Sequence, residues 1–242
     1  MEQLAEHFHR YFRVEPALTQ SQREAVFRLR YQVYCEELQF ENVQDFPDGL
    51  ETDAFDPQSL HCLLIHKASG QAAGCFRLIL HSESGQGLPF LSICQNRLDD
   101  TEWHPNRIAH DQLGEISRLA VHGNFRRRQG ETSTPIGVTS GSLEEPSSRQ
   151  YPLVATGLFL ASTALAMQIG LQRVYVMMEP RLARLLRSCG IMFKQVGEVM
   201  DYHGRRGPFM ISRELIHQHL PADAKQLMDD FRLQFEAQIE HP

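Results

Sequence analysis

The pattern of apolar and polar positions along the chain predicts an alternation of helices and strands. Helices are expected at residues 2–12, 21–38, 90–98, 151–171, 180–188 and 221–240, and strands at 61–67, 73–80, 115–122, 173–178, 191–199 and 208–215. A capping box of Ser21 and Glu24 is expected to open the second helix. The chain from 41 to 60 is acidic and loop-like.

This order of elements predicts the fold class, a single mixed α/β domain over residues 1–242 with its core at about 13–216. Strand 115–122, helix 151–171 and strand 173–178 follow one another, so the two strands are expected to be parallel with a right-handed crossover. A C-terminal helix at about 221–240 closes the chain. Residues 123–150 form a polar insertion rich in Arg, Gly, Ser, Thr and Pro.

One stretch, residues 151–171, contains no charged residue and has the length of a membrane span. It is, however, rich in Ala, Thr, Ser and Gly, and it contains Gln168. Small residues favour a buried helix that approaches its neighbours closely. We therefore expect a helix packed on a sheet and no transmembrane span.

The strand at 115–122 carries two charges among branched apolar residues. Glu115 and Arg118 are three positions apart and would face opposite sides of a regular strand. A charged side chain on a core strand costs free energy unless it forms an ion pair or takes part in binding or catalysis. The strand is therefore expected to border a cleft, with a β-bulge bringing both charges to one side. The alternative is a plain salt bridge at a strand edge.

Composition narrows the class of protein further. Hydrophobic residues make up 42% of the chain, and the formal net charge is −6, which provides no attraction toward nucleic acid or anionic membrane. Five cysteines without a C-x-x-C pair indicate buried thiols of a reducing compartment, so a cytoplasmic location is expected. The N-terminus lacks a signal-peptide pattern. The twelve histidines show no metal-ligand spacing, and no metal site is predicted.

The run Arg126-Arg127-Arg128-Gln129-Gly130 follows the charged strand. A glycine-rich loop before a helix can cradle a pyrophosphate group. Here no second glycine follows at the right spacing and an acidic residue comes next, so the loop is a poor cradle. Docking of the acidic surface of a partner protein suits the basic run better. A solvated charge run is the alternative.

Several motifs together resemble the autoinducer (acyl-homoserine-lactone) synthases. Their R-x-x-x-F helix, acidic pair, G-x-x-R-L strand and E-x-x-R strand occur here in the same order. The matching residues are Arg30 with Tyr34 and Phe40, Asp53-x-x-Asp56, Arg77, and Glu115-x-x-Arg118. The match spans roughly residues 20–200.

Two features depart from those synthases. Phe40 stands where they usually have Trp, and a long insertion follows the charged strand. In these features the chain is similar to long-chain N-acyl amino acid synthases and to acyltransferases associated with the PEP-CTERM/exosortase system.

The resemblance implies a GNAT-like fold and transfer of a fatty acyl group from a thioester to an amine. The donor would be acyl carrier protein (acyl-ACP), docked on the basic run of Arg126, Arg127 and Arg128, or acyl-CoA, with no tightly bound cofactor. The other partner would be a small-molecule amine, with no nucleic acid; peripheral membrane contact through the product stays open. The substrate-binding residues implied are Arg30, Tyr34, Phe40, Asp53, Asp56 and Arg77, with the two aspartates paired to Arg30 and Arg77.

The catalytic residues implied are Glu115, Arg118, Leu119 and Val121. Glu115 would be the general base, acting directly or through a water, because an α-amine has a pKa near ~8 and needs only a modest base. Arg118 would hold Glu115 or bind a substrate carboxylate. A backbone N–H near Leu119–Val121 would be the oxyanion donor, since the two parallel strands of this fold splay apart to admit the thioester.

Three functions remain open on sequence grounds. The leading hypothesis is long-chain N-acylation of an amino acid or similar amine. The second is acyl-homoserine-lactone synthesis from S-adenosylmethionine. The third is a non-catalytic acyl-binding module on the same fold.

Overall fold

The computed structural model describes residues 4–81, 87–126 and 153–239. The chain divides into two compact units. The first comprises Met1–Ala54, His61–Arg77 and Arg118–Phe159, and the second comprises Phe55–Leu60, Leu78–Ser117 and Leu160–Pro242. Each unit is therefore assembled from segments that are distant in sequence.

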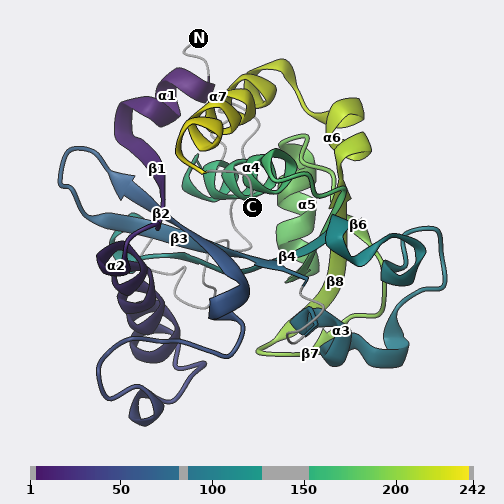
Figure 1. Ribbon diagram of the computed structural model, residues 1–242, viewed down its shortest axis with the longest axis horizontal. Helices are drawn as coiled ribbons and strands as arrows, with labels where there is room; N and C mark the ends of the chain where they lie inside the picture. Colours follow the sequence, from purple (N-terminus) through teal and green to yellow (C-terminus); the bar gives the residue numbers. More distant parts are fainter. Residues whose placement is uncertain (1–3, 82–86, 127–152, 240–242) are drawn as a thin grey trace. The chain divides into compact units, whose positions relative to one another are not determined.

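The first unit combines short helices with three strands and the end of a fourth. Its elements are α1 (Leu4–Tyr11), β1 (Phe12–Pro16), α2 (Gln20–Arg30), the π-helix η1 (Tyr31–Glu37), the 3-10 turns η2 (Val43–Asp45) and η7 (Gly123–Phe125), and parts of β2 (Ser59–His66), β3 (Ala72–Leu80), β4 (Leu113–Val121) and α4 (Leu153–Gln168). The strands follow the order β1, β2, β3, β4 (Figure 1). Antiparallel pairing of β1 with β2 runs from Phe12↔His66 to Pro16↔Cys62.

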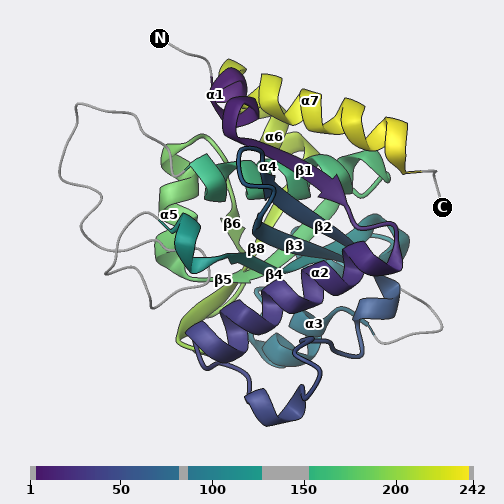
Figure 2. The same ribbon diagram turned by 90° about the vertical axis from the view of Figure 1, so that its left-hand side faces the viewer.

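Helix α2 covers one face of these strands (Figure 2). Its buried Val26 and Leu29 share an apolar cluster with Leu63 and Ile65 of β2. The N-cap of α2 is Thr19, whose side chain accepts the N–H of Gln22 while the Gln22 side chain accepts the N–H of Thr19. The capping box predicted at Ser21 and Glu24 is therefore wrong, because Ser21 already lies inside the helix and Thr19 has the extended backbone that a cap needs.

The helix predicted to reach residue 38 does so in two forms. After Arg30 the chain continues as the π-helix η1, and Leu38 closes it by donating its N–H to the carbonyl of Val33. π-Helices are rare and often lie at functional sites. The predicted hairpin is confirmed as β2 and β3.

The uncharged segment forms α4, and its residues from Ala155 to Met167 are predominantly buried. A Cβ atom on Gly74 would lie only 3.1 Å from Leu158, so this helix packs closely on β3, as expected. Among the described residues, the helices lack the combination of length and apolarity that crossing a bilayer requires.

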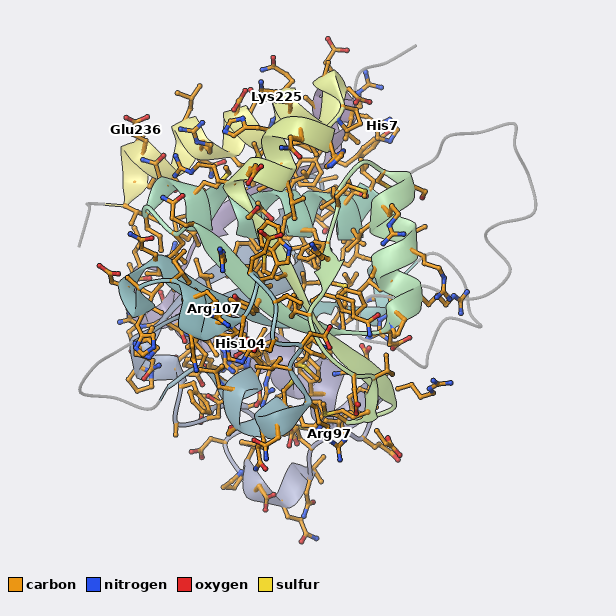
Figure 3. All side chains as sticks on the ribbon, turned by 90° about the vertical axis from the view of Figure 1, so that its right-hand side faces the viewer. His7, Arg97, His104, Arg107, Lys225 and Glu236 are labelled. Carbon is orange, nitrogen blue, oxygen red and sulfur yellow. The ribbon has the colours of Figure 1, made fainter. Side chains whose placement is uncertain are left out.

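The second unit holds the rest of the sheet. Its further elements are η3 (Asp56–Gln58), α3 (Pro89–Cys94), η4 (Gln95–Arg97), η5 (Pro105–Arg107), η6 (His110–Gln112), β5 (Arg173–Met178), α5 (Pro180–Ser188), β6 (Lys194–Gln195), β7 (Met200–Asp201), β8 (Arg205–Ser212), α6 (Arg213–His219) and α7 (Ala222–Gln238). The strand order is β4, β5, β8, β6, with β7 paired to β8. Lys225 and Glu236 project from the exposed face of α7 (Figure 3).

The parallel pairing predicted for β4 and β5 is confirmed. Its register covers Leu113↔Arg173, Gly114↔Val174 and Glu115↔Tyr175 and ends there, although β4 continues to Val121. Strand β5 pairs along its whole length, to Met178, with antiparallel β8 on its other side. The two parallel strands therefore share backbone bonds only at the start of β4.

Two strand predictions near the C-terminus need correction. Within the predicted strand 191–199 only Lys194–Gln195 is a strand, because the apolar residues around it are buried in loop conformation and Gly197 bridges Leu98 instead. The strand predicted at 208–215 begins at Arg205 and ends at Ser212. The Ser212 side chain caps α6 by accepting the N–H of Leu215 at 3.2 Å.

Candidate acyl-transfer site

The first unit contains a network of charged side chains. Its centre is Glu51, whose side chain is fully buried. The carboxylate of Glu51 pairs with the guanidinium of Arg30, which is also fully buried, and accepts bonds from Arg118 Nε and Nη2 at 3.1 and 3.0 Å. The fully buried Arg30 and the partly buried Arg118 thus share one carboxylate.

The electrostatics of this centre follow from that sharing. Burial alone would raise the pKa of Glu51, but the positive charges and hydrogen bonds of Arg30 and Arg118 outweigh it and lower this pKa below its ordinary value. For Arg118, burial opposes the charge, and Glu51 reverses that effect and raises the pKa. Glu51 and Arg118 are therefore both charged at neutral pH.

The exposed edge of the network is acidic. Asp53 pairs with Arg77 at 2.5 Å and lies 3.4 Å from Arg118, which also pairs with Glu41 at 3.3 Å. The side chains of Glu41 and Asp53 are 30% and 24% exposed, whereas that of Arg77 is 2% exposed. Carboxylates therefore form the part of the network that solvent reaches most readily.

Arg118 has an unusual backbone for a strand residue. Its φ of +47° lies in the left-handed region, which costs a residue with a side chain of the order of 1–2 kcal/mol. Its carbonyl accepts a weak bond from the Cys75 thiol at 3.6 Å. This departure from extended geometry is the kind of irregularity that the predicted bulge requires. The ion pairs of Arg118 are with Glu41, Glu51 and Asp53, and these pairs fix its guanidinium.

Tyr34 of the π-helix contacts both Arg118 and its neighbour. Its hydroxyl donates to the carbonyl of Leu119 at 3.2 Å, and its ring lies under the Arg118 guanidinium, 5.5 Å from centroid to Cζ. Phe40 is half-buried against the same apolar cluster, and its N–H donates to the carbonyl of Tyr34 at 2.8 Å. Arg30, Tyr34, Phe40, Asp53, Arg77, Arg118 and Leu119 thus belong to one region of the first unit.

The thiols of Cys35 and Cys75, next to this network, are not nucleophiles. Burial, reinforced by the charges of Glu51 and Glu41, raises the pKa of Cys35 to about 11. Burial raises the pKa of Cys75 to about 12. Both thiols are protonated at neutral pH, as expected for structural cysteines.

Glu115 lies in the second unit and is 3% exposed. Its carboxylate accepts the N–H of Phe90, in the first turn of α3, at 2.8 Å. Glu115 is also the last residue of β4 in register with β5. A buried carboxylate therefore marks the point where the parallel pairing ends.

The remaining predicted residues are more dispersed. Asp56 lies in the second unit as the first residue of η3, and Arg30 pairs with Glu51, which was not among the predicted residues. Val121 is buried at the end of β4. The side chain of Arg126 is 4% exposed and bonded to Glu37, whereas Arg127 and Arg128 lie outside the described residues.

Sequence reasoning missed Glu51 and Glu41, which it treated only as acidic loop residues. Arg30, Arg77 and Arg118 carry three positive charges, whereas the predicted Asp53 and Asp56 supply only two negative charges. This difference would have indicated that further carboxylates take part. Within the described part of the chain, no three His, Cys, Asp or Glu side chains gather as metal ligands would.

Comparison with known proteins agrees with this geometry. Residues 29–134 match the family model described as an acetyltransferase (GNAT) domain. No curated protein matches the sequence. Among solved structures, FeeM, an N-acyl amino acid synthase from uncultured soil microbes, has 15% identity and a TM-score of 0.55, covering 86% of this chain and 94% of its own.

Two acyl-homoserine lactone relatives are similar in the same way. TofI, in a ternary complex with an inhibitor and MTA, has 17% identity and a TM-score of 0.53, covering 90% of this chain and 96% of its own. MesI, a CoA-dependent acyl-homoserine lactone synthase, has 20% identity and a TM-score of 0.53, covering 91% of this chain and 95% of its own. Residues 29–134 thus resemble a GNAT acetyltransferase domain, and the chain shares the α/β fold of FeeM, TofI and MesI.

Proposed function

We propose that the protein transfers a long-chain fatty acyl group from an acyl carrier protein thioester to the amine of an amino acid or a similar small molecule. The observation that carries this proposal is the end of β4–β5 pairing at Glu115, six residues before β4 itself ends. Beyond Glu115, β4 is out of register with β5, so an extended ligand would join β4 at this edge. A thioester arm can add to such an edge as an extra strand.

The acceptor side of the proposal rests on the acidic edge of the charge network. An α-amine with a pKa near ~8 arrives mainly as ammonium at neutral pH. Glu41 and Asp53 are the most exposed carboxylates of the network and would attract that ammonium. Arg118 would then meet the acceptor's own carboxylate only by giving up part of its present pairing.

The reaction then needs a neutral amine and a polarised carbonyl. Glu115 would take the proton from the amine nitrogen, directly or through a water, and the nitrogen would attack the thioester carbon. An N–H of Leu119–Val121 would stabilise the resulting oxyanion. Collapse of the tetrahedral intermediate would break the C–S bond, and the thiolate of the carrier arm would leave and take up the second proton that the nitrogen loses on becoming an amide.

The decisive variant is Glu115→Gln. The amide oxygen of glutamine can still accept the N–H of Phe90, so the fold is kept while the base is lost. We expect turnover to fall by ~10²–10⁴-fold, the usual contribution of a general base. Asp111→Asn, an exposed acid just before the same strand, is the matched control and should retain wild-type turnover.

The assay is mass spectrometry of N-acyl products, with hexadecanoyl-ACP and hexadecanoyl-CoA compared as donors over a panel of amino acids. If a folded Glu115→Gln variant had wild-type turnover, Glu115 would not be the general base, and its role would be limited to the hydrogen bond that holds α3. No N-acyl product from the wild-type protein with either donor would refute the proposed reaction and favour a non-catalytic acyl-binding module.

The likeness to TofI and MesI favours a second candidate, acyl-homoserine-lactone synthesis. That reaction would consume S-adenosylmethionine and release methylthioadenosine. Methylthioadenosine formation that depends on both the acyl donor and S-adenosylmethionine would establish it over amino acid acylation.

A further inference from the structure

Glu37, the last residue of the π-helix, holds the turn that follows β4. Its carboxylate accepts the N–H of Gly123 at 3.1 Å and a bond from Arg126 Nη2, and it lies 3.9 Å from His122 Nε2. These partners are 85 or more residues away in sequence. One side chain thus joins the helix to three residues of the turn.

Arg126 completes the connection back to the strand. Its Nε donates to the carbonyl of Val121, the last residue of β4, at 2.8 Å. The side chains of Arg126 and Glu37 are 4% and 26% exposed, so their ion pair is partly shielded from water. Charge-assisted bonds in such surroundings are stronger than those at an open surface.

The same helix contacts β4 at an earlier point through Tyr34, whose hydroxyl donates to the Leu119 carbonyl. The π-helix therefore holds the strand at Leu119 and again just beyond Val121. Gly123 allows the second contact, because a Cβ atom there would lie 3.0 Å from Glu37 Oε1. The stretch between the two contacts is the one that offers its backbone to the acyl donor in the proposed function.

We propose that Glu37 is a positioning residue for the acyl donor: it fixes the final residues of β4 in the register that receives the thioester arm. This inference rests on the proposed function for the identity of the ligand. An arm bound by backbone hydrogen bonds needs those groups held in place before it arrives, since ordering them on binding weakens affinity.

The test is binding of S-hexadecyl phosphopantetheine, a thioether of the arm that acyl carrier protein and coenzyme A share, measured by calorimetry on the full chain. Glu37→Gln keeps an acceptor for Gly123 but loses the charge that holds Arg126. We expect ~10-fold weaker binding, the loss of about one charge-assisted hydrogen bond. In turnover assays the donor KM should rise by the same factor. The kcat should also fall, because the proposed oxyanion donor lies in the same stretch of β4, while the acceptor KM stays within ~2-fold, as expected for an independent site.

Glu36→Gln is the matched control, because Glu36 is the neighbouring glutamate and is exposed. It should bind the probe as the wild type does. Arg126→Lys, which can keep the charge but not both bonds, should lie between the wild type and Glu37→Gln. Circular dichroism and thermal unfolding establish that each variant is folded.

The outcomes separate this inference from the proposed reaction. Equal probe affinity of wild type and folded Glu37→Gln overturns the positioning role, even if acyl transfer is observed. Weaker probe binding by Glu37→Gln supports the role, even if the wild type transfers no acyl group to any amine tested. Absence of probe binding by the wild type overturns it as well.

Discussion

Replacement of Glu51 by glutamine should destabilise the protein more than any other single loss of charge in the first unit. Glutamine has nearly the same shape, so the change removes the negative charge and leaves the packing intact. Arg30 then keeps its positive charge at a site with no exposed surface, and Arg118 loses its shortest bonds. The perturbation is therefore electrostatic.

The size of the effect follows from burial. Removing one partner of a buried ion pair costs ~3–5 kcal/mol, because the remaining charge stays desolvated. Glu51 serves two guanidinium groups, while Glu41 and Asp53 still compensate Arg118 in part. We therefore expect a loss of ~3–4 kcal/mol in the free energy of unfolding at pH 7.

Urea unfolding followed by circular dichroism and fluorescence measures this loss. Asp100→Asn breaks the pair with Arg107, whose side chains are 83% and 59% exposed, and should leave the urea midpoint unchanged. A loss for Glu51→Gln no larger than that of this control would refute the reasoning, because it would show that the Glu51 charge contributes nothing net.

The same pair of proteins tests the pKa. Because folding lowers the pKa of Glu51, its contribution is complete above the ordinary value of 4.5 and is lost as the pH falls through the lower folded value. The stability difference between wild type and Glu51→Gln should therefore be constant at neutral pH and shrink in acid. A difference that grows on acidification would contradict the direction of the shift.

Three further results are expected. Asp53→Asn should raise the acceptor KM by ~10-fold with little change in donor KM, since it removes one exposed carboxylate of the network; a wild-type acceptor KM in steady-state assays would argue against that role. Gly157→Ala should lower stability by ~1–3 kcal/mol in urea unfolding, because its methyl group would lie 2.0 Å from the ring of Phe8, and combining it with Phe8→Leu should recover part of the loss. Cys35 and Cys75 have pKa values raised to about 11 and about 12, so at pH 8 they should react with a disulfide reagent at least ~100-fold more slowly in the native protein than in urea. Mass spectrometry of the labelled peptides identifies which thiol has reacted. Fast labelling of either thiol in the native protein would contradict its burial.

Sequence patterns identified the parts of the fold that depend on local signals. The parallel strands β4 and β5, the hairpin of β2 and β3, and the helix after Pro180 were each indicated by runs of apolar residues and clear boundaries. The segment 191–199 misled the same reasoning, because its apolar residues fill the core from a loop. Periodicity does not distinguish a buried loop from a short strand.

The site was predicted less completely for a different reason. The motifs carried by resemblance named Arg30, Asp53, Arg77 and Arg118, which lie in one region of the first unit, but they did not supply Glu51, the carboxylate that pairs with Arg30 and Arg118. Glu51 is identified by tertiary contact alone, since its partners lie 21 and 67 residues away. The π-helix also has no sequence signal of its own, because one additional residue per turn leaves composition unchanged.

The order in which the ribosome delivers these residues has a consequence for synthesis. Arg30 and Glu51 emerge early, but Arg118 follows Glu51 by 67 residues, Leu119 follows Tyr34 by 85, and Arg126 follows Glu37 by 89. At ~5–20 residues per second, the early half waits several seconds without Arg118 and Arg126, the arginines that pair with Glu41 and Glu37. A nascent chain stalled before position 118 should accordingly remain sensitive to protease and dependent on chaperones, and should become resistant only after Arg118 has left the exit tunnel.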